Sequence, residues 1–254
     1  MKKIYILFIA LFLTGCVSKA PELNGFKQQS YMGKELYLTG QEKNIKAGQK
    51  LRIYIDGNAE TVGLFSKKAA LRNSIAAGLA QKDKSKSILY LNRPCYFSED
   101  KKCLPVVWEE GKYMPEVIDE MVYVLSNLAE KYKIPEMEFV GYDGGGAVAL
   151  LVATRLNGKK INVSKVITIA GILDTEQYAR MMDEPLLEGS LNPAREGFSI
   201  SKIPQLHIVG ALDKKTPVFF AQELKKRMMN PVSYKVQSYA SADHDNWLKF
   251  KMDY

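Results

Sequence analysis

The chain has 254 residues, a formal net charge of +8 and an apolar content of 46%, which is ordinary for a soluble globular protein. Its lysines are dispersed along the sequence without a concentrated basic stripe, so the charge does not indicate a nucleic-acid partner. The length allows one large core or two small ones, and we expect one domain because no repeat, low-complexity segment or clear linker follows residue 30.

The N-terminus has the features of an export signal. Lys2 and Lys3 precede an unbroken apolar run over 4–13, which is too short to span a bilayer. The run ends in Leu-Thr-Gly-Cys at 13–16, which resembles the bacterial lipobox. The resemblance implies a signal peptide over 1–15 and lipidation of Cys16, with Val17 favouring the outer membrane facing the periplasm. The alternative is an ordinary secretory signal with a chance cysteine.

The segment after Cys16 is polar, and we expect residues 16–30 to form the lipidated cysteine and a tether to a single domain over 31–254. Cys95 and Cys103 remain as an even pair, which favours a disulfide in an oxidising compartment; two free thiols are the alternative. No histidine or third cysteine lies near them in the sequence, so we expect no metal site, and nothing indicates a cofactor.

Strands and helices alternate through the domain. The pattern predicts strands over 51–55, 87–91, 138–141, 166–170, 206–209 and 233–239, and helices over 69–82, 115–128, 147–153, 217–229 and 245–252. The runs at 166–170 and 206–209 are continuously apolar, which is typical of strands buried on both faces of a parallel sheet. The alternation predicts an α/β fold with a mostly parallel sheet covered by helices on both faces.

Residues 139–146 read Phe-Val-Gly-Tyr-Asp-Gly-Gly-Gly, a strand followed by a glycine-rich turn and a helix. This is the frame of the nucleophile elbow, G-x-S-x-G, with Asp143 in the position of the serine. Gly141 and Gly145 would let the strand and the helix approach each other around the turn. A phosphate loop is the alternative, but no Walker lysine follows and the dinucleotide fingerprint is only loosely met.

Two further candidates follow later strands. Asp213 comes after the strand at 206–209, and His244 comes after the strand at 233–239. Ligand sites of open α/β sheets lie at the carboxyl ends of the strands, and the order nucleophile, acid, histidine is that of α/β hydrolases. The alternatives are a helix cap for Asp213 and a surface position for His244, while His207 is expected in the core.

Tyr-Ile-Asp-Gly-Asn at 54–58 follows an early strand and occupies the position of an oxyanion loop. Two other segments resemble a group of bacterial exported α/β hydrolases: Leu-Asn-Arg-Pro-Cys-Tyr at 91–96 and Gly-Ser-Leu-Asn-Pro at 189–193. The resemblance covers roughly residues 50–250 and implies an α/β-hydrolase fold with a sheet of about eight strands. It also implies an ester-hydrolase-like site, with an oxyanion hole made by the backbone amides of Gly144 and of Gly57 or Asn58. The elbow of that group commonly carries serine, and this chain departs from it at Asp143.

An aspartate changes the chemistry that the elbow can perform. A serine needs a histidine to activate it, whereas Asp143 would be ionised and could attack saturated carbon, as in relatives that act on alkyl halides or epoxides. Tyr178 could donate a proton to an epoxide oxygen. Asp143 could also act as a general base on water, or it could mark the loss of catalysis.

The sequence therefore predicts a membrane-anchored hydrolase that acts on a small ester-like, alkyl or epoxide substrate through Asp143, His244 and Asp213. The alternative is a non-catalytic lipoprotein with the same fold that binds a ligand or an envelope partner.

Overall fold

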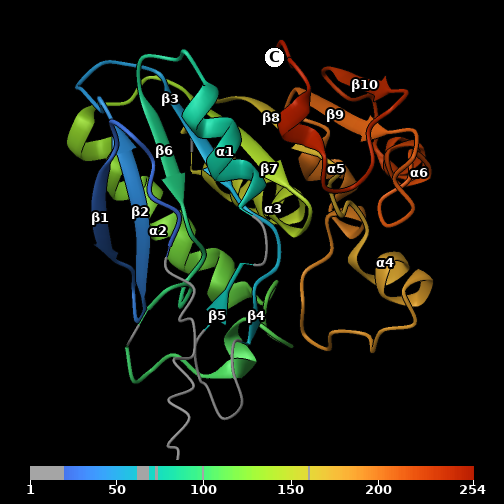
Figure 1. The fold of residues 1–254 in the computed structure, drawn as a ribbon, viewed down its shortest axis with the longest axis horizontal. Coiled ribbons are helices and arrows are strands. Elements are labelled where there is room, and N and C mark those ends of the chain that lie inside the picture. The colour runs from blue at the N-terminus through green and yellow to red at the C-terminus, as the bar shows by residue number, and fades with distance from the viewer. Residues whose placement is uncertain (1–19, 62–68, 72–73, 99, 160) are drawn as a thin grey trace, which may run out of the picture.

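The protein is built around an eight-stranded sheet with the strand order β1-β2-β6-β3-β7-β8-β9-β10 (Figure 1). The structure is a computed structural model that describes residues 20–61, 69–71, 74–98, 100–159 and 161–254. The strands of the sheet are β1 (Lys27–Met32), β2 (Tyr37–Lys43), β3 (Leu51–Ile55), β6 (Ile88–Leu91), β7 (Met137–Tyr142), β8 (Val163–Ile169), β9 (Gln205–Gly210) and β10 (Tyr234–Tyr239). A separate ladder joins β4 (Glu60–Thr61) to β5 (Ala69–Ala70).

Seven of the eight strands point in the same direction. β3 pairs in parallel with β6 and β7, and the parallel series continues through β8 and β9 to β10. Only β2 runs against its neighbours β1 and β6. The predicted mostly parallel sheet is confirmed, and its central strand β7 is buried along its whole length.

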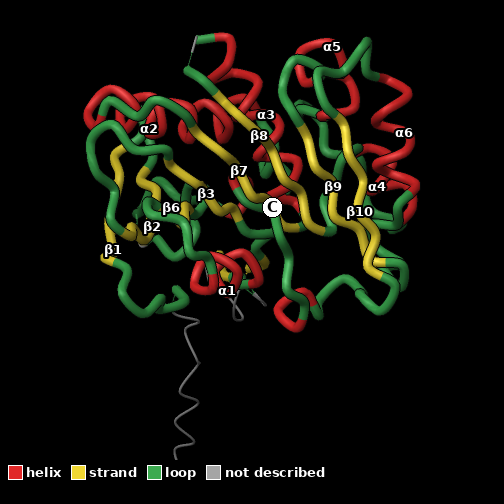
Figure 2. The backbone as a smooth tube through the Cα atoms, turned by 90° about the horizontal axis from the view of Figure 1, so that it is seen from above, coloured by secondary structure: helices red, strands yellow, loops and turns green. Residues whose placement is uncertain are grey.

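Helices cover both faces of the sheet, as the view from above shows (Figure 2). They are α1 (Ile75–Lys82), α2 (Pro115–Tyr132), α3 (Gly144–Gly158), α4 (Thr175–Met181), α5 (Gly197–Ile200) and α6 (Phe219–Arg227), with short 3-10 turns at Pro105–Val107, Pro193–Arg195 and Trp247–Lys249. α1 and the turn at Trp247 lie on one face, and α2, α3 and α6 lie on the other. α3 is buried on almost every side because its residues are glycine and apolar.

Two large clusters of buried apolar side chains fill the space between the sheet and these helices. Both clusters and the whole eight-stranded sheet are formed by residues from Leu23 onward. The described residues therefore form both clusters. Among the described residues, none of the helices has the length and apolarity needed to cross a bilayer.

The structure differs from the predicted elements at several places, and β2 and α4 are among the elements that were not predicted. Residues 27–30, expected in the tether, belong to β1, and Leu23 is already buried in the core. The sequence Lys-Gln-Gln-Ser-Tyr-Met of β1 lacks an apolar pattern because β1 is an edge strand. The helix expected over 69–82 begins only at Ile75, and the helix expected over 245–252 is a single 3-10 turn.

Candidate active site

The turn between β7 and α3 holds Asp143 in an unusual backbone conformation, with φ 50° and ψ −124°. Non-glycine residues seldom adopt a positive φ. Three hydrogen bonds support it: the amide of Asp143 donates to the Ile169 carbonyl at 3.1 Å, and its carbonyl accepts from Gly146 at 2.9 Å and Ile172 at 3.0 Å. The geometry is that of a sharp strand-to-helix elbow, as the glycine pattern predicted.

His244 lies between two carboxylates. Its Nδ1 is 3.0 Å from Oδ2 of Asp213, and its Nε2 is 3.4 Å from Oδ1 of Asp143. Thr216 adds to the arrangement because its hydroxyl donates to Oδ2 of Asp213 at 2.6 Å. The three candidate residues thus meet at the carboxyl ends of β7, β9 and β10, while their catalytic roles stay a prediction.

The charges of the triad stabilise one another. Burial by itself lowers the pKa of His244, but the contacts with Asp143 and Asp213 outweigh burial and raise this pKa to about 9. Burial by itself raises the pKa values of both aspartates, and contacts with His244 more than offset it, so both pKa values lie below their ordinary range. At neutral pH the site is therefore an imidazolium between two carboxylates.

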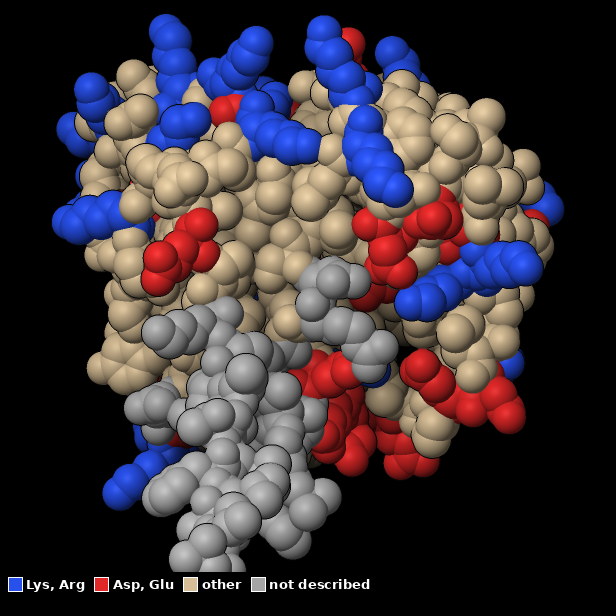
Figure 3. All heavy atoms as spheres, in the orientation of Figure 1, with Lys and Arg blue, Asp and Glu red and all other residues tan. Residues whose placement is uncertain are grey.

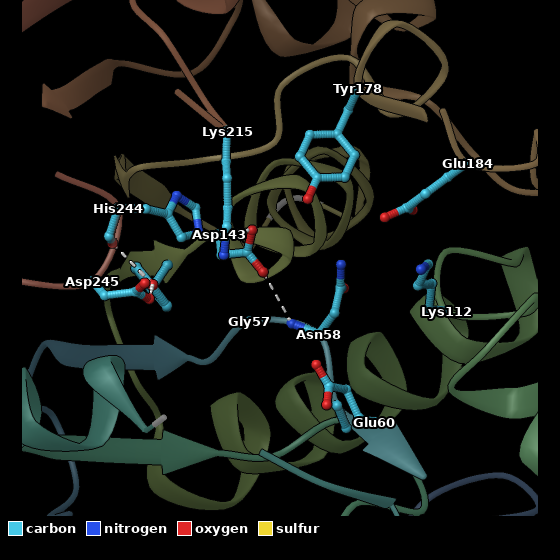
Figure 4. A pocket seen from close by; sticks show the side chains of 12 residues that line it. Gly57, Asn58, Glu60, Lys112, Asp143, Tyr178, Glu184, Lys215, His244 and Asp245 are labelled. Atoms are coloured by element: carbon cyan, nitrogen blue, oxygen red, sulfur yellow. Dashed lines mark hydrogen bonds and ion pairs between the residues drawn. The ribbon is translucent and has the colours of Figure 1, made fainter. Parts of the chain in front are cut away.

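The Asp143 carboxylate also occupies the position expected for an oxyanion (Figure 4). Its Oδ2 accepts a hydrogen bond from the amide of Asn58 at 3.2 Å, and the amide of Gly144 donates to the same carboxylate. The amide of Gly57 instead bonds to the side chain of Asp56. Of the two alternatives in the loop after β3, the amide of Asn58 is therefore the one that faces Asp143.

The buried side chain of Arg93 supports the loop that follows β3. Nη2 of Arg93 donates to the Asp56 carbonyl at 3.2 Å and to Oδ1 of Asn58 at 3.1 Å, and the Tyr113 hydroxyl donates to Oδ1 of Asn58 at 3.0 Å. Arg93 is 1% exposed, and its Nε and Nη1 have no hydrogen-bond partner in the described part of the chain. Sequence reasoning missed this role, although Arg93 lies in one of the segments that carried the resemblance.

Cys95 and Cys103 form a disulfide, as the even cysteine count predicted. Tyr96, the neighbour of Cys95, accepts a hydrogen bond through its hydroxyl from the amide of Ala59 at 2.9 Å. The disulfide therefore links the two ends of the segment 95–103, and Tyr96 in this segment contacts the loop after β3.

A cavity of about 290 Å³ opens beside Asp143 and His244. Figure 4 shows Lys112, Tyr178 and Glu184 facing it on the side away from His244. Burial lowers the pKa of Lys112. The lining is mostly polar and charged, which suits a small polar ligand. No group of metal-ligating side chains occurs in the described ranges.

The remaining histidine is a core residue, as expected. His207 is fully buried in β9, where its Nδ1 lies 2.7 Å from the hydroxyl of Thr168. Burial lowers its pKa to about 3, so His207 is neutral. Cys16, the predicted lipidation site, lies outside the described residues, as does the predicted signal peptide.

A family model described as "Alpha/beta hydrolase of unknown function (DUF915)" matches residues 101–189, the stretch that contains Asp143 and α3. No curated protein matches the chain by sequence.

Solved structures of hydrolases resemble the chain over most of its length. A putative dienelactone hydrolase from Klebsiella pneumoniae subsp. pneumoniae MGH 78578 is 15% identical with a TM-score of 0.59, over 90% of each chain. The Pyrococcus furiosus esterase Pf2001 is 16% identical with a TM-score of 0.59, over 88% of this chain and 84% of that chain. An acylaminoacyl peptidase of Pyrococcus horikoshii is 15% identical with a TM-score of 0.65, over 89% of this chain and 39% of that chain. The protein has the α/β-hydrolase fold.

Proposed function

We propose that the protein is a hydrolase in which Asp143 is the nucleophile, His244 is the base and Asp213 orients the histidine. The substrate is a small polar molecule with an electrophilic carbon in an epoxide, alkyl or ester-like group. One observation carries the proposal: the Asp143 carboxylate has one oxygen at the amide of Asn58 and the other near Nε2 of His244. In the proposed reaction, the oxygen near His244 attacks the substrate in the first step. The amide of Asn58 binds the oxyanion in the second step.

In the first step Oδ1 of Asp143 attacks the electrophilic carbon. The pKa of Asp143 lies below its ordinary range because contacts with His244 and two amides outweigh the effect of burial, so the carboxylate needs no base. A carbon–oxygen bond forms to Asp143, and the bond from carbon to the leaving oxygen breaks. With an epoxide, that oxygen takes a proton from the Tyr178 hydroxyl at the cavity, and Tyr178 regains a proton from solvent.

In the second step water hydrolyses the Asp143 ester. Esterification removes the negative charge that helps to hold the pKa of His244 at about 9, so the imidazolium releases its proton to solvent. Nε2 of His244 then takes a proton from water as that water attacks Cγ of Asp143. The oxyanion forms beside the amides of Asn58 and Gly144, and its collapse frees the alcohol, which receives the proton from His244. The proton that remains on the Asp143 carboxyl then passes to His244, which restores the carboxylate and the imidazolium.

The cavity supports a small substrate. Its volume of about 290 Å³ lies at the lower end of the range for ligand sites, and charged side chains line the part away from His244. We therefore favour epoxides or esters that carry further polar groups over simple haloalkanes.

Heavy-oxygen labelling tests the nucleophile. Protein in excess of substrate undergoes a single turnover in heavy-oxygen water, and mass spectrometry of the peptide that contains Asp143 should then find label in its carboxylate. Asp143→Asn should lose turnover of the same substrate. Turnover that leaves the Asp143 carboxylate unlabelled rules out the covalent route.

A second candidate function is ligand binding without catalysis. It is favoured by the closed arrangement of Asp143 and His244, in which every charge of the triad is satisfied without a substrate. Ester and epoxide panels separate the two. If the wild-type protein is inert and Asp143→Ser gains esterase activity, the native chain is better explained as a binding protein.

We further propose that a lipid on Cys16 anchors the protein to the outer membrane, facing the periplasm. The apolar run over 4–13, its lipobox-like end and the disulfide between Cys95 and Cys103 support export to an oxidising compartment. In cell fractionation, Cys16→Ser should move the protein from the membrane to the soluble fraction. Retention of Cys16→Ser in the membrane would contradict the anchor.

A further inference from the structure

Lysines that are dispersed along the sequence gather at one edge of the folded protein. Because β3 and β6 to β10 are parallel, their amino ends share one edge of the sheet. The segments that lead into these strands carry exposed lysines, which we call the basic edge: Lys46, Lys84, Lys86, Lys133, Lys159, Lys202 and Lys225. Figure 3 shows lysines and arginines projecting along the upper border of the molecule, while acidic groups gather below.

Some carboxylates at the basic edge are paired with cations, whereas Glu130 and Asp253 are exposed near Lys159 and Lys84. Asp83 lies 3.0 Å from Nη1 of Arg52, and Glu136 lies 2.6 Å from Nζ of Lys50. The loops at the opposite edge, around the candidate active site, carry exposed acidic residues: Glu60, Glu109, Glu110, Asp183, Glu184, Glu188, Asp243 and Asp245. Lysines therefore predominate at the basic edge, and most of the exposed carboxylates near the candidate active site lie at the opposite edge.

Exposed apolar side chains lie among the lysines of the basic edge. Phe198, Met229 and Val232 are 59%, 66% and 68% exposed. They belong to neighbouring segments, since the amide of Val232 donates to the Ser201 carbonyl at 2.9 Å. Nζ of Lys202 lies 4.3 Å from the centroid of the Phe198 ring. The basic edge is therefore amphipathic, with apolar groups next to cations.

The helix dipole accounts for only part of this pattern. Helices end at the amino edge of a parallel sheet, and cations such as Lys133 and Lys159 are favourable near their last turns. Lys46 follows a strand, however, and Lys202 follows a helix of only four residues. The dipole also gives no reason for exposing Phe198, Met229 and Val232.

We propose that the basic edge docks on an anionic phospholipid bilayer. Lysines near the surface are attracted to acidic headgroups, and Phe198, Met229 and Val232 enter the boundary between headgroups and acyl chains. An acidic polymer would match the lysines but would leave the apolar side chains uncovered, which is why the bilayer is the better occupant. Docking by this edge turns the cavity at Asp143 toward water, so substrate reaches it from the aqueous side.

Vesicle co-sedimentation tests the proposal with the chain from residue 17 onward, which contains both core clusters and lacks Cys16. It should sediment with vesicles of equal parts phosphatidylglycerol and phosphatidylcholine, should not sediment with phosphatidylcholine alone, and should be released by high salt. The double variant Lys46→Gln/Lys202→Gln should weaken binding by roughly tenfold or more. Lys101→Gln/Lys102→Gln, with the same charge change on the other edge, should bind like the wild type.

Phe198→Ser tests the apolar contribution, because it should weaken vesicle binding while it leaves binding to heparin, an acidic polymer without acyl chains, unchanged. Unchanged thermal unfolding of each variant shows that it is folded. Equal loss in the two lysine pairs, binding that is indifferent to phosphatidylglycerol, or binding to heparin without binding to vesicles overturns the proposal.

Discussion

At the scale of single residues, the Asp143 carboxylate lies where two different groups would lie in a serine hydrolase. One oxygen lies 3.4 Å from Nε2 of His244, and the other accepts a hydrogen bond from the amide of Asn58 at 3.2 Å. A serine hydroxyl has one oxygen and can meet only the first of these contacts. An aspartate at this position therefore meets both contacts at once, through its two carboxylate oxygens.

The pKa of His244 predicts how stability depends on pH. The folded-state pKa is raised from 6.5 to about 9 because contacts with Asp143 and Asp213 outweigh burial. This contribution to the free energy of unfolding is fully present below about pH 6.5 and is lost as the pH rises through 9. Urea unfolding of wild type and His244→Gln should therefore give stabilities that converge above pH 9. If the free energies of unfolding of wild type and His244→Gln differed by the same amount at every pH, the ion pair of His244 with the aspartates would be contradicted.

Arg93 gives a second prediction at this scale. Arg93→Met should lower turnover by about tenfold or more, because Asn58 loses a partner that orients its amide toward the oxyanion. Stability should change little, because Arg93 is a buried charge with two unpartnered nitrogens that methionine removes. Steady-state kinetics on the substrate that wild type hydrolyses, together with urea unfolding, measure both effects. A stable variant with full turnover would show that the contact is dispensable.

At the scale of elements, the site depends on how closely α3 approaches the end of β3. A Cβ on Gly145 would collide with the carbonyl oxygens of Ile55 and Asp56, which are backbone atoms and cannot move aside. The glycines of the elbow therefore bring the Asp143 turn against the loop that carries Asn58. Through this contact, the first turn of α3 packs directly against the end of β3.

Two alanine substitutions in α3 test this contact. Gly145→Ala should lower the free energy of unfolding by about 2 kcal/mol or more, because the methyl group overlaps backbone atoms. Gly158→Ala is the matched control: its Cβ would meet nothing within 4 Å, so it should be neutral or stabilising by up to about 1 kcal/mol. Urea unfolding measures both. Similar effects at the two positions would show that the close approach is not required.

At the scale of the whole molecule, the two core clusters pack on opposite faces of the same sheet. We therefore expect the described residues to unfold together. The two tryptophans report on different regions: Trp247 packs in the cluster on the α1 face, and Trp108 packs in a small cluster beside the disulfide. In Trp108→Phe and in Trp247→Phe, fluorescence of the remaining tryptophan should give the same midpoint as circular dichroism of that variant. Separate midpoints within one variant would indicate two folding units.

Much of the fold was predictable because its signals are local. Two of the parallel strands were visible as continuous apolar runs at 166–170 and 206–209, and the order of Asp143, Asp213 and His244 placed all three at one edge of the sheet. β1 was not predicted, because an edge strand paired on one side needs no apolar face. Residues 245–252 lack a helix because Trp247 and Phe250 pack against Tyr239 at the end of β10, and this contact is tertiary.

The sequence by itself determined the α/β architecture, the elbow with aspartate at position 143 and the residues that could form a triad. Only the tertiary structure decided that the Asp143 carboxylate bonds to the amide of Asn58, that Arg93 supports that loop, and that dispersed lysines gather at one edge. The physical reason is the separation along the sequence of the residues that are in contact. Periodicity and turn residues express contacts between near neighbours, whereas these features join residues that only the packing of parallel strands brings together.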